Sequence, residues 1–275
     1  GSEMCIRDRN RVERRVIISC KFSARVWAML IVLPPSETKA PGGESDGLDV
    51  SFSSLDPIRQ EIMEDLAALD VDEMMAALKL PATKREEAEE NRALMRAPVM
   101  PAIYRYTGVL YDALDAATLT DPAVSRIAIG SALFGVVMGS DTIPRYRLSG
   151  GSKLPVRQTD AAAQKNSIPT MKKRWGSAIT DVLQEQDFVV DMRSGAYQQL
   201  GPVPGAVTVR VESVQEDGSR KVVSHFNKHY KGELARVLAS APDADSVTDI
   251  QGVAAIAEAA GMTVEISGRE LTLVV

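Results

Sequence analysis

The sequence predicts one compact mixed α/β domain over residues 29–275, in which strands and helices are interleaved. Short apolar runs rich in β-branched residues alternate with segments of helical periodicity along the whole length. No internal repeat or low-complexity linker separates these segments, and 275 residues suit one large domain, with two small ones as the alternative. The balance of 45% hydrophobic and 25% charged residues is typical of a globular protein that buries a sizeable core.

Residues 1–28 differ in composition from the rest of the chain. They carry seven Lys or Arg against three Asp or Glu, and neither a helical nor a strand period persists. We expect translation to start at Met29 and residues 1–28 to be a non-native or disordered extension, with a basic DNA-binding arm as the alternative. The apolar stretch 16–19 is too short for a signal peptide, and no apolar run approaches the ~20 residues that span a bilayer. A cytoplasmic protein with no membrane partner is therefore expected.

The first half of the domain is predicted to begin with a strand and to continue mainly as helices. Residues 29–33 form an apolar run that ends at Pro34-Pro35, which indicates a buried first strand. Residues 40–51 are rich in Gly, Asp and Ser and predict a loop. Asp56-Pro57 places a proline in the first turn of a helix over residues 56–69. Further helices are expected at residues 74–80, 85–96 and 107–117.

The second half alternates more regularly between strands and helices. Residues 125–131 are rich in β-branched and small apolar side chains, which predicts a central strand. Trp175, Ile179 and Leu183 share one face of a helix predicted over residues 172–186. The Asp217-Gly218 pair predicts a hairpin between residues 206–215 and 221–226. The remaining expected elements are extended segments at 143–148 and 188–192, helices at 228–239 and 247–260, and a last hairpin of 262–266 and 271–275.

Charge is unevenly distributed along the chain. The whole sequence has a net charge of −5, yet residues 141–236 carry 15 basic and 10 acidic side chains. Within this basic segment, cations stand next to aromatic rings at residues 145–147, 172–175 and 225–231. Basic side chains neutralise phosphates and aromatic planes stack on bases, so the pattern favours nucleic-acid binding, with solvated faces and core aromatics as the alternative.

Two motifs offer candidate phosphate contacts. The polar segment 34–39 follows the first strand, where α/β proteins place ligands, and its Ser36, Thr38 and Lys39 could meet a phosphate. Residues 77–92 have the layout of a helix-hairpin-helix, whose turn would present Thr83, Lys84 and Arg85 to a DNA phosphate. Four glutamates on the second helix would repel a phosphate backbone, so any contact must come from the turn. A strand terminator and an ordinary helical turn are the structural alternatives.

The sequence shows no clear metal-binding or cofactor-binding motif. Both cysteines, Cys5 and Cys20, lie in the N-terminal segment, and the two histidines, His225 and His229, have no evident third ligand. The sequence also lacks a nucleophile elbow, a phosphate-cradling glycine-rich loop and a nicotinamide fingerprint. We therefore expect no metal and no cofactor.

Six segments, taken in order, resemble the YaaA family of bacterial peroxide-stress resistance proteins: LPPSETKAPGG (33–43), RYTGVLYDAL (105–114), SALFGV (131–136), DTIPRYRLS (141–149), RSGAY (193–197) and KHYKGELAR (228–236). The resemblance implies a cytosolic protein linked to hydrogen peroxide resistance, with a fold of its own type. It also implies a positively charged cleft and a helix-hairpin-helix that bind duplex or branched DNA. By motif it assigns the hairpin contacts to Thr83, Lys84 and Arg85, and the cleft contacts to Thr38, Arg105, Tyr111, Arg145, Tyr146, Arg147, Lys228, Lys231 and Arg236.

Two classes of function remain open. The first is a DNA-binding protein of the peroxide response without turnover, for which Arg145, Arg147, Lys228, Lys231 and Arg236 must converge in one cleft. The second is an enzyme acting on a nucleobase or nucleotide in the same cleft, with Ser36, Glu37, Asp112, Ser194 or Tyr197 near the chemistry. A broad basic groove would favour binding, whereas a narrow pocket that holds a carboxylate with a raised pKa would favour catalysis.

Overall fold

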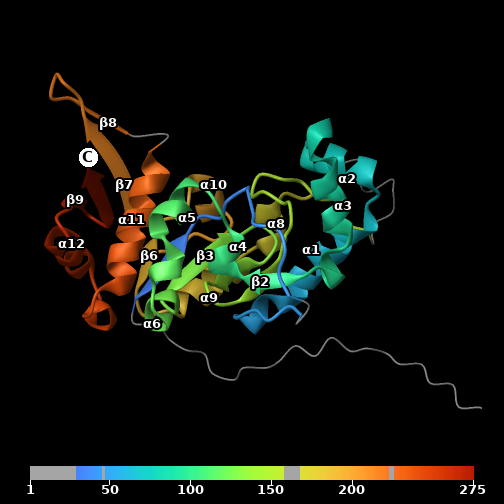
Figure 1. The fold of residues 1–275 in the computed structure, drawn as a ribbon, viewed down its shortest axis with the longest axis horizontal. Helices are drawn as coiled ribbons and strands as arrows, with labels where there is room; N and C mark the ends of the chain where they lie inside the picture. The colour runs from blue at the N-terminus through green and yellow to red at the C-terminus, as the bar shows by residue number, and fades with distance from the viewer. Residues whose placement is uncertain (1–28, 45–46, 158–167, 223–225) are drawn as a thin grey trace, which may run out of the picture.

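One large sheet runs through the molecule in the computed structural model, which describes residues 29–44, 47–157, 168–222 and 226–275 (Figure 1). Its strand order is β4-β3-β1-β6-β7-β10-β9, and β8 pairs with β7. The sheet mixes parallel and antiparallel pairs and is packed with helices, which confirms the predicted mixed α/β class. The strands are β1 (Leu30–Leu33), β3 (Ile127–Ser131), β4 (Gly135–Met138), β6 (Val189–Asp191), β7 (Val207–Val214), β8 (Arg220–Val222), β9 (Thr263–Ser267) and β10 (Glu270–Val274).

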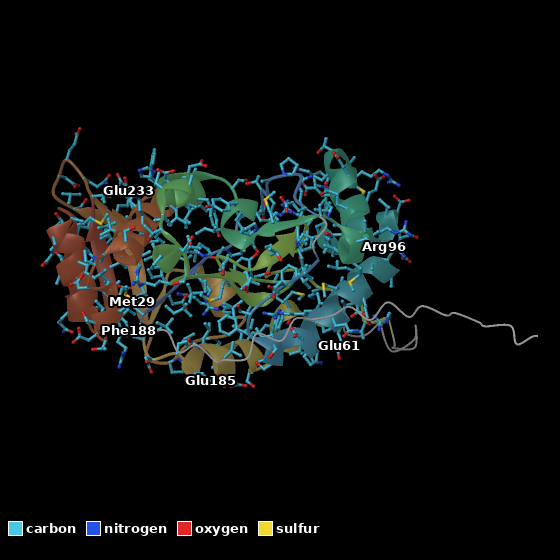
Figure 2. The ribbon with its side chains drawn as sticks, turned by 60° about the horizontal axis from the view of Figure 1, so that its bottom comes forward. Met29, Glu61, Arg96, Glu185, Phe188 and Glu233 are labelled. Carbon is cyan, nitrogen blue, oxygen red and sulfur yellow. The ribbon has the colours of Figure 1, made fainter. Side chains whose placement is uncertain are left out.

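The centre of the sheet is parallel and buried. All four residues of β1 are fully buried, as the unbroken apolar run predicts for a strand that is covered on both faces. β1 pairs in parallel with β3 on one side and with β6 on the other. Met29 and Phe188 lie side by side at the start of β1 and β6 (Figure 2). The carboxyl ends of β1, β3 and β6 therefore share one edge of the sheet, where α/β proteins place ligands.

A second, two-stranded sheet joins β2 (Val99–Pro101) to β5 (Thr142–Pro144) in antiparallel pairing. Strand β5 covers only the start of the extended segment predicted for residues 143–148. Beyond Pro144, the side chain of Asn91 takes over the backbone pairing: it accepts from Arg147 N–H at 2.8 Å and donates to Arg147 O at 2.7 Å. A buried asparagine thus holds the segment 145–147 in place without a strand neighbour.

The helices flank the sheet, with α1, α2 and α3 gathered at one end of the molecule and α12 at the other (Figure 1). No helix within the described ranges is long and apolar enough to cross a bilayer. The predictions for residues 1–28 and for His225 lie outside the described residues. The helices are α1 (Asp56–Ala68), α2 (Val71–Leu78), α3 (Arg85–Arg92), α4 (Ala102–Arg105), α5 (Val109–Leu114), α6 (Asp121–Val124), α8 (Met171–Trp175), α9 (Ala178–Gln184), α10 (Gly195–Gln198), α11 (Asn227–Ser240) and α12 (Ile250–Ala259).

Two predicted helices are shorter than expected because glycines interrupt them. The single helix predicted over residues 172–186 is two helices, α8 and α9, because Gly176 has a φ of 55° at the end of α8. The helix predicted from residue 107 begins only after Gly108, which has a φ of 102°. Both angles lie in the region that favours glycine.

Gly232 lets α11 pack closely against α5. A Cβ atom at this position would lie 2.2 Å from the carbonyl oxygen of Leu110, which is backbone and cannot move aside. We therefore expect Gly232→Ala to lower the free energy of unfolding by about 3 kcal/mol, through overpacking between the two helices. Thermal unfolding checks this, with Gly195→Ala as the control because a Cβ there meets nothing within 4 Å. An unchanged melting temperature in Gly232→Ala would contradict the packing described.

Candidate functional site

A small polar hollow lies beside the segment that follows β1. Its volume is about 130 Å³, and the residues that line it come from three stretches of chain that are distant in sequence. These are the loop after β1, the start of α3 with the turn before it, and the segment that follows β5. The lining residues are Glu37, Thr38, Lys39, Lys84, Glu87, Glu90, Arg145 and Tyr146.

Lys39 is the most unusual side chain of this hollow. It is 7% exposed, and its ammonium nitrogen lies 4.2 Å from the ring centroid of Tyr146 and 5.2 Å from that of Tyr106. It donates to Ser36 O at 3.0 Å, so its polar partner is a backbone carbonyl. Burial, followed by the charge of Arg147, lowers the pKa of Lys39 to about 7, against the opposing effect of nearby carboxylates. Near neutral pH this lysine therefore exists partly as a neutral amine.

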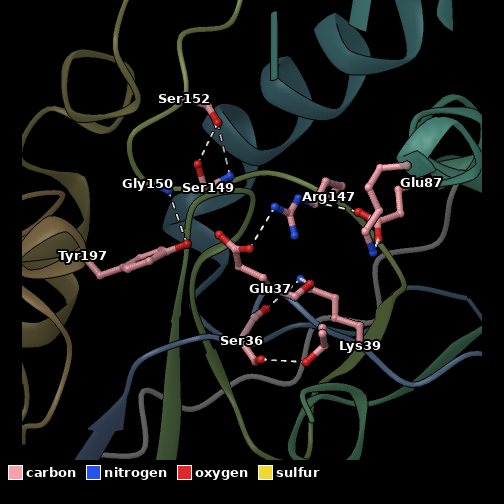
Figure 3. A network of polar contacts seen from close by, with 11 residues as sticks. Ser36, Glu37, Lys39, Glu87, Arg147, Ser149, Gly150, Ser152 and Tyr197 are labelled. Atoms are coloured by element: carbon pink, nitrogen blue, oxygen red, sulfur yellow. Dashed lines mark hydrogen bonds and ion pairs between the residues drawn. The ribbon is translucent and has the colours of Figure 1, made fainter. Parts of the chain in front are cut away.

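Three carboxylates hold the other cations of the hollow. Arg147 lies between two of them, 3.0 Å from Glu37 and 3.6 Å from Glu87 (Figure 3). Arg145 pairs with Glu90, and Lys84 pairs with Glu87 at 2.6 Å. Because Glu87 and Glu90 stand three residues apart on α3, both side chains reach the segment 145–147. The hollow is thus close to charge balance.

One carboxylate oxygen of the hollow has no hydrogen-bond donor among the residues that the structure describes. This oxygen is Glu87 Oε2, which is buried and lies 3.6 Å from Arg147 Nε. A buried acceptor without a donor costs free energy, and a catalytic role or a bound water or ion is among the explanations for such an atom. Glu87 Oε2 is therefore a place where a donor group of a bound molecule would gain a hydrogen bond.

A chain of buried hydroxyls lies next to Lys39. Tyr106 Oη and Tyr146 Oη are 2.7 Å apart, and Tyr146 Oη lies 2.7 Å from Ser131 Oγ at the end of β3. Ser131 Oγ accepts from the backbone N–H of Phe134 at 3.0 Å, which fixes its orientation. Burial raises the pKa of both tyrosines, so their hydroxyls stay protonated. The prediction that Tyr146 contacts DNA needs correction, because this ring is 3% exposed and packs beside Lys39.

Arg105, which the family resemblance assigned to the DNA-binding cleft, has a structural role. Arg105 is fully buried and donates to four backbone carbonyls, those of Ala40, Gly42, Pro98 and Ile143. Four of its five N–H donors are used in this way and the side chain has no exposed surface, which argues against the assigned phosphate contact. Tyr111, assigned to the same cleft, is 7% exposed and donates to Pro34 O at 2.9 Å.

The cations of α11 do not join the hollow. Lys231 is buried and donates to Met192 O at 3.1 Å, and burial lowers its pKa. Arg236 lies 3.1 Å from Asp115 and lines a separate, open hollow of about 610 Å³ together with Asp112. Lys228 is exposed at the start of the helix. The expected single cleft is therefore divided, because Arg145 and Arg236 line different hollows.

The turn of the predicted helix-hairpin-helix lies between α2 and α3, and a short 3-10 turn, η2 (Ala82–Lys84), forms part of it. Thr83, Lys84 and Arg85 are all exposed, as a phosphate contact requires. Arg85 pairs with Asp72 at 2.6 Å and approaches Glu89 at 3.6 Å. The glutamates that follow the turn thus neutralise its own cations. DNA binding by this motif stays a prediction.

The fold brings together only some of the residues that were proposed for the enzyme alternative. Ser36 Oγ lies 3.1 Å from Thr38 Oγ1, and Glu37 pairs with Arg147 (Figure 3). Tyr197 lies beside the same network, where its hydroxyl accepts from Gly150 N–H at 3.3 Å. Asp112 belongs to the separate hollow, and Ser194 is exposed at the start of α10. Within the described ranges, no three His, Cys, Asp or Glu side chains gather as a metal site.

Three residues of the hollow have roles that their sequence context does not reveal. The sequence indicates Lys39 only as a phosphate contact, and Glu87 and Glu90 only as charges that repel a phosphate. Their interaction with Arg145 and Arg147 bridges more than fifty positions of sequence, which no local pattern reveals. The signal that the sequence offers for Lys39 is its place in the polar segment 34–39, which follows a buried strand.

Comparison with known proteins identifies the family. A family model described as peroxide stress protein YaaA matches residues 29–258. A UPF0246 protein of Corynebacterium glutamicum is 58% identical over 255 residues, which cover 90% of this chain and 100% of the relative. A UPF0246 protein of Corynebacterium efficiens is 59% identical over 250 residues (89% and 98%), and one of Streptomyces coelicolor is 36% identical over 225 residues (76% and 82%). The chain therefore belongs to the peroxide stress protein YaaA family, as its six sequence segments predicted, and this membership supports a role in oxidative stress.

Proposed function

We propose that the protein acts in the peroxide response by binding DNA without regard to sequence, with the backbone phosphates lying against the hollow around Lys39. The observation that carries this proposal is that cations from three separate segments, Lys39, Lys84 and Arg145, line one hollow. Converging cations position a phosphate backbone but do not distinguish bases. Membership of a peroxide-stress family supports the cellular role.

The carboxylates of the hollow shape the expected affinity. Glu37, Glu87 and Glu90 orient Arg145, Arg147 and Lys84, yet they also weaken the positive field. A phosphate that approaches must compete with these carboxylates for the same donors. We therefore expect weak binding that rests on few phosphate contacts and disappears at moderate salt.

The salt dependence of binding tests this proposal. We expect electrophoretic shifts with duplex and junction DNA at low salt, and a logarithm of affinity that falls linearly with the logarithm of salt concentration. Arg147→Ala should weaken binding and reduce that slope by about 0.9, the value for one lost phosphate contact. Lys84→Ala with Arg85→Ala should weaken it only modestly.

Lys221→Ala is the matched control, since this exposed lysine lies on β8, remote from the hairpin helices (Figure 1). It should leave the slope unchanged. The absence of any shift by the full chain at low salt would overturn the DNA proposal. A slope that Arg147→Ala leaves unchanged would assign this arginine a structural role.

A second candidate is an enzyme that acts on a nucleobase or nucleotide in the same hollow. It is favoured by the hollow's narrowness and by a buried lysine whose pKa is lowered to about 7, a combination more typical of catalytic than of purely structural lysines. Nuclear magnetic resonance of nucleoside and nucleotide mixtures incubated with the protein tests it. New product signals that Lys39→Met abolishes would support this candidate.

A further inference from the structure

Lys39 differs from every other cation that lines its hollow. Lys84 and Arg145 are in ion pairs with carboxylates, and so is the adjacent Arg147. Lys39 has no ion pair in the part of the chain that the structure describes, and its amine donates only to the carbonyls of Ser36 and Glu37. The fold thus places an amine in a polar hollow without a direct ion pair to a carboxylate, although carboxylates lie nearby.

The groups packed around Lys39 come from every neighbouring segment. Tyr106 and Tyr146 provide a face of aromatic rings, and Arg145 and Arg147 provide positive charge that disfavours a second cation. Glu37, Glu87 and Glu90, with Lys84, complete the charged groups of the hollow. An ordinary lysine is about 0.03% neutral at pH 7, whereas a lysine with a pKa near 7 is about half neutral, which is roughly a thousandfold more free amine.

We propose that Lys39 is a nucleophile that forms a covalent imine with an aldehyde bound in the hollow. The lone pair of Nζ adds to the carbonyl carbon, and the carbonyl oxygen takes up the proton that leaves the nitrogen. Loss of this hydroxyl as water leaves a C=N bond, so amine and aldehyde give imine and water without an oxidant or reductant.

Glu87 is placed to carry the proton in this step. Its Oε2 atom is buried without a hydrogen-bond donor, and its charge is near enough to raise the pKa of Lys39 against the effect of burial. A carboxylate in this position can take the proton from nitrogen and return it to the leaving hydroxyl. The arrangement supplies both a nucleophile and a proton carrier.

The size and charge of the hollow limit the aldehydes that fit. A volume of about 130 Å³ admits a few heavy atoms, and Arg145 and Lys84 can hold an attached carboxylate or phosphate. A small acidic aldehyde and the open sugar of an abasic site in DNA share this chemistry. If the aldehyde is an abasic site, the inference rests on the proposed DNA binding. If the aldehyde is a free small molecule, it does not.

Reductive trapping with glyoxylate tests the nucleophile itself. The full chain is incubated at pH 7 with glyoxylate and sodium cyanoborohydride, which reduces an imine to a stable secondary amine, and is then mapped by peptide mass spectrometry. We expect carboxymethylation at Lys39 to exceed that at the exposed Lys79 by at least about tenfold. Lys39→Arg, which keeps the charge but cannot form the imine, should lose this adduct, while Lys221→Arg should retain it.

A second arm uses duplex DNA with one abasic site and borohydride, followed by denaturing electrophoresis. A trapped complex that Lys39→Arg abolishes would support the proposal with DNA as the aldehyde source. Trapping of glyoxylate but not of DNA would support imine formation by Lys39 with a free aldehyde as the substrate. The DNA-binding proposal would then be decided by the salt dependence of DNA binding. Labelling of Lys39 no greater than that of Lys79 in the first arm, with no trapped DNA in the second, would overturn the inference even if intact duplex is bound.

Discussion

Replacing Arg105 by alanine is expected to lower the free energy of unfolding by about 3–5 kcal/mol. The side chain is fully buried, and its guanidinium donates to the carbonyls of Ala40, Gly42, Pro98 and Ile143. Alanine would leave these four acceptors without their donor and would open a cavity between the loop after β1 and the small sheet. Both losses act in the same direction.

Urea denaturation of Arg105→Ala and of the matched surface variant Arg92→Ala measures this effect. Arg92 is exposed and forms no ion pair with the described residues, so its replacement should change stability by less than about 0.5 kcal/mol. Arg105→Lys should also be destabilised, because one ammonium cannot reproduce the planar fork of donors. An Arg105→Ala protein of normal stability that has lost DNA binding would restore the role that the family resemblance assigned.

Arg105 also shows where prediction from sequence fails. The family resemblance assigned Arg105, which stands between Tyr104 and Tyr106, to a DNA-binding cleft. Its acceptors Ala40 and Gly42 belong to a loop more than sixty positions earlier in the chain. Burial of a charged side chain among backbone carbonyls depends on tertiary contacts, which a single sequence does not display.

The strands were more accessible to prediction because their signals are local. The apolar run after Met29 predicted β1, and the Asp217-Gly218 turn predicted the pairing of β7 with β8. β4 was not predicted as a separate strand, because the apolar residues from Ile127 to Met138 continue through the tight turn after Ser131. In that turn, Ser131 Oγ accepts hydrogen bonds from the N–H groups of Leu133 and Phe134. The residues around Ser131 in the sequence do not predict these hydrogen bonds.

Three residues that the resemblance assigned to DNA contacts line the hollow together: Thr38 and Arg145, assigned to the cleft, and Lys84, assigned to the hairpin turn. Their contact with DNA stays a prediction. The acidic face of α3 also has a structural role, which a count of charges does not predict. Glu87 and Glu90 repel a phosphate in isolation, yet in the fold they position the arginines of the segment 145–147. The effect of Glu87 and Glu90 on the hollow thus depends on Arg145 and Arg147, which are distant from them in sequence.

Lys39→Met is expected to change how stability depends on pH. The lysine's pKa is lowered to about 7 in the folded protein, whereas in the unfolded chain it is near its ordinary value of 10.5. Between these two values the unfolded state binds the extra proton, so the stability of the original protein rises with pH through this window. Below about pH 7 the cost of burying Lys39 is fully present. Methionine has no proton to exchange and fills a similar volume.

We therefore expect Lys39→Met to be the more stable protein at pH 6.5, and its advantage to shrink by about 4 kcal/mol as the pH rises to 10. Urea denaturation of both proteins at several pH values measures the difference, in which titrations common to the two cancel. Lys172→Met, at an exposed position on α8, is the control and should follow the original protein at every pH. Parallel stability curves for Lys39→Met and the original protein would mean that Lys39 keeps its proton when folded. The same result would remove the free amine on which imine formation depends, so this measurement links the stability of the fold to the chemistry proposed for its hollow.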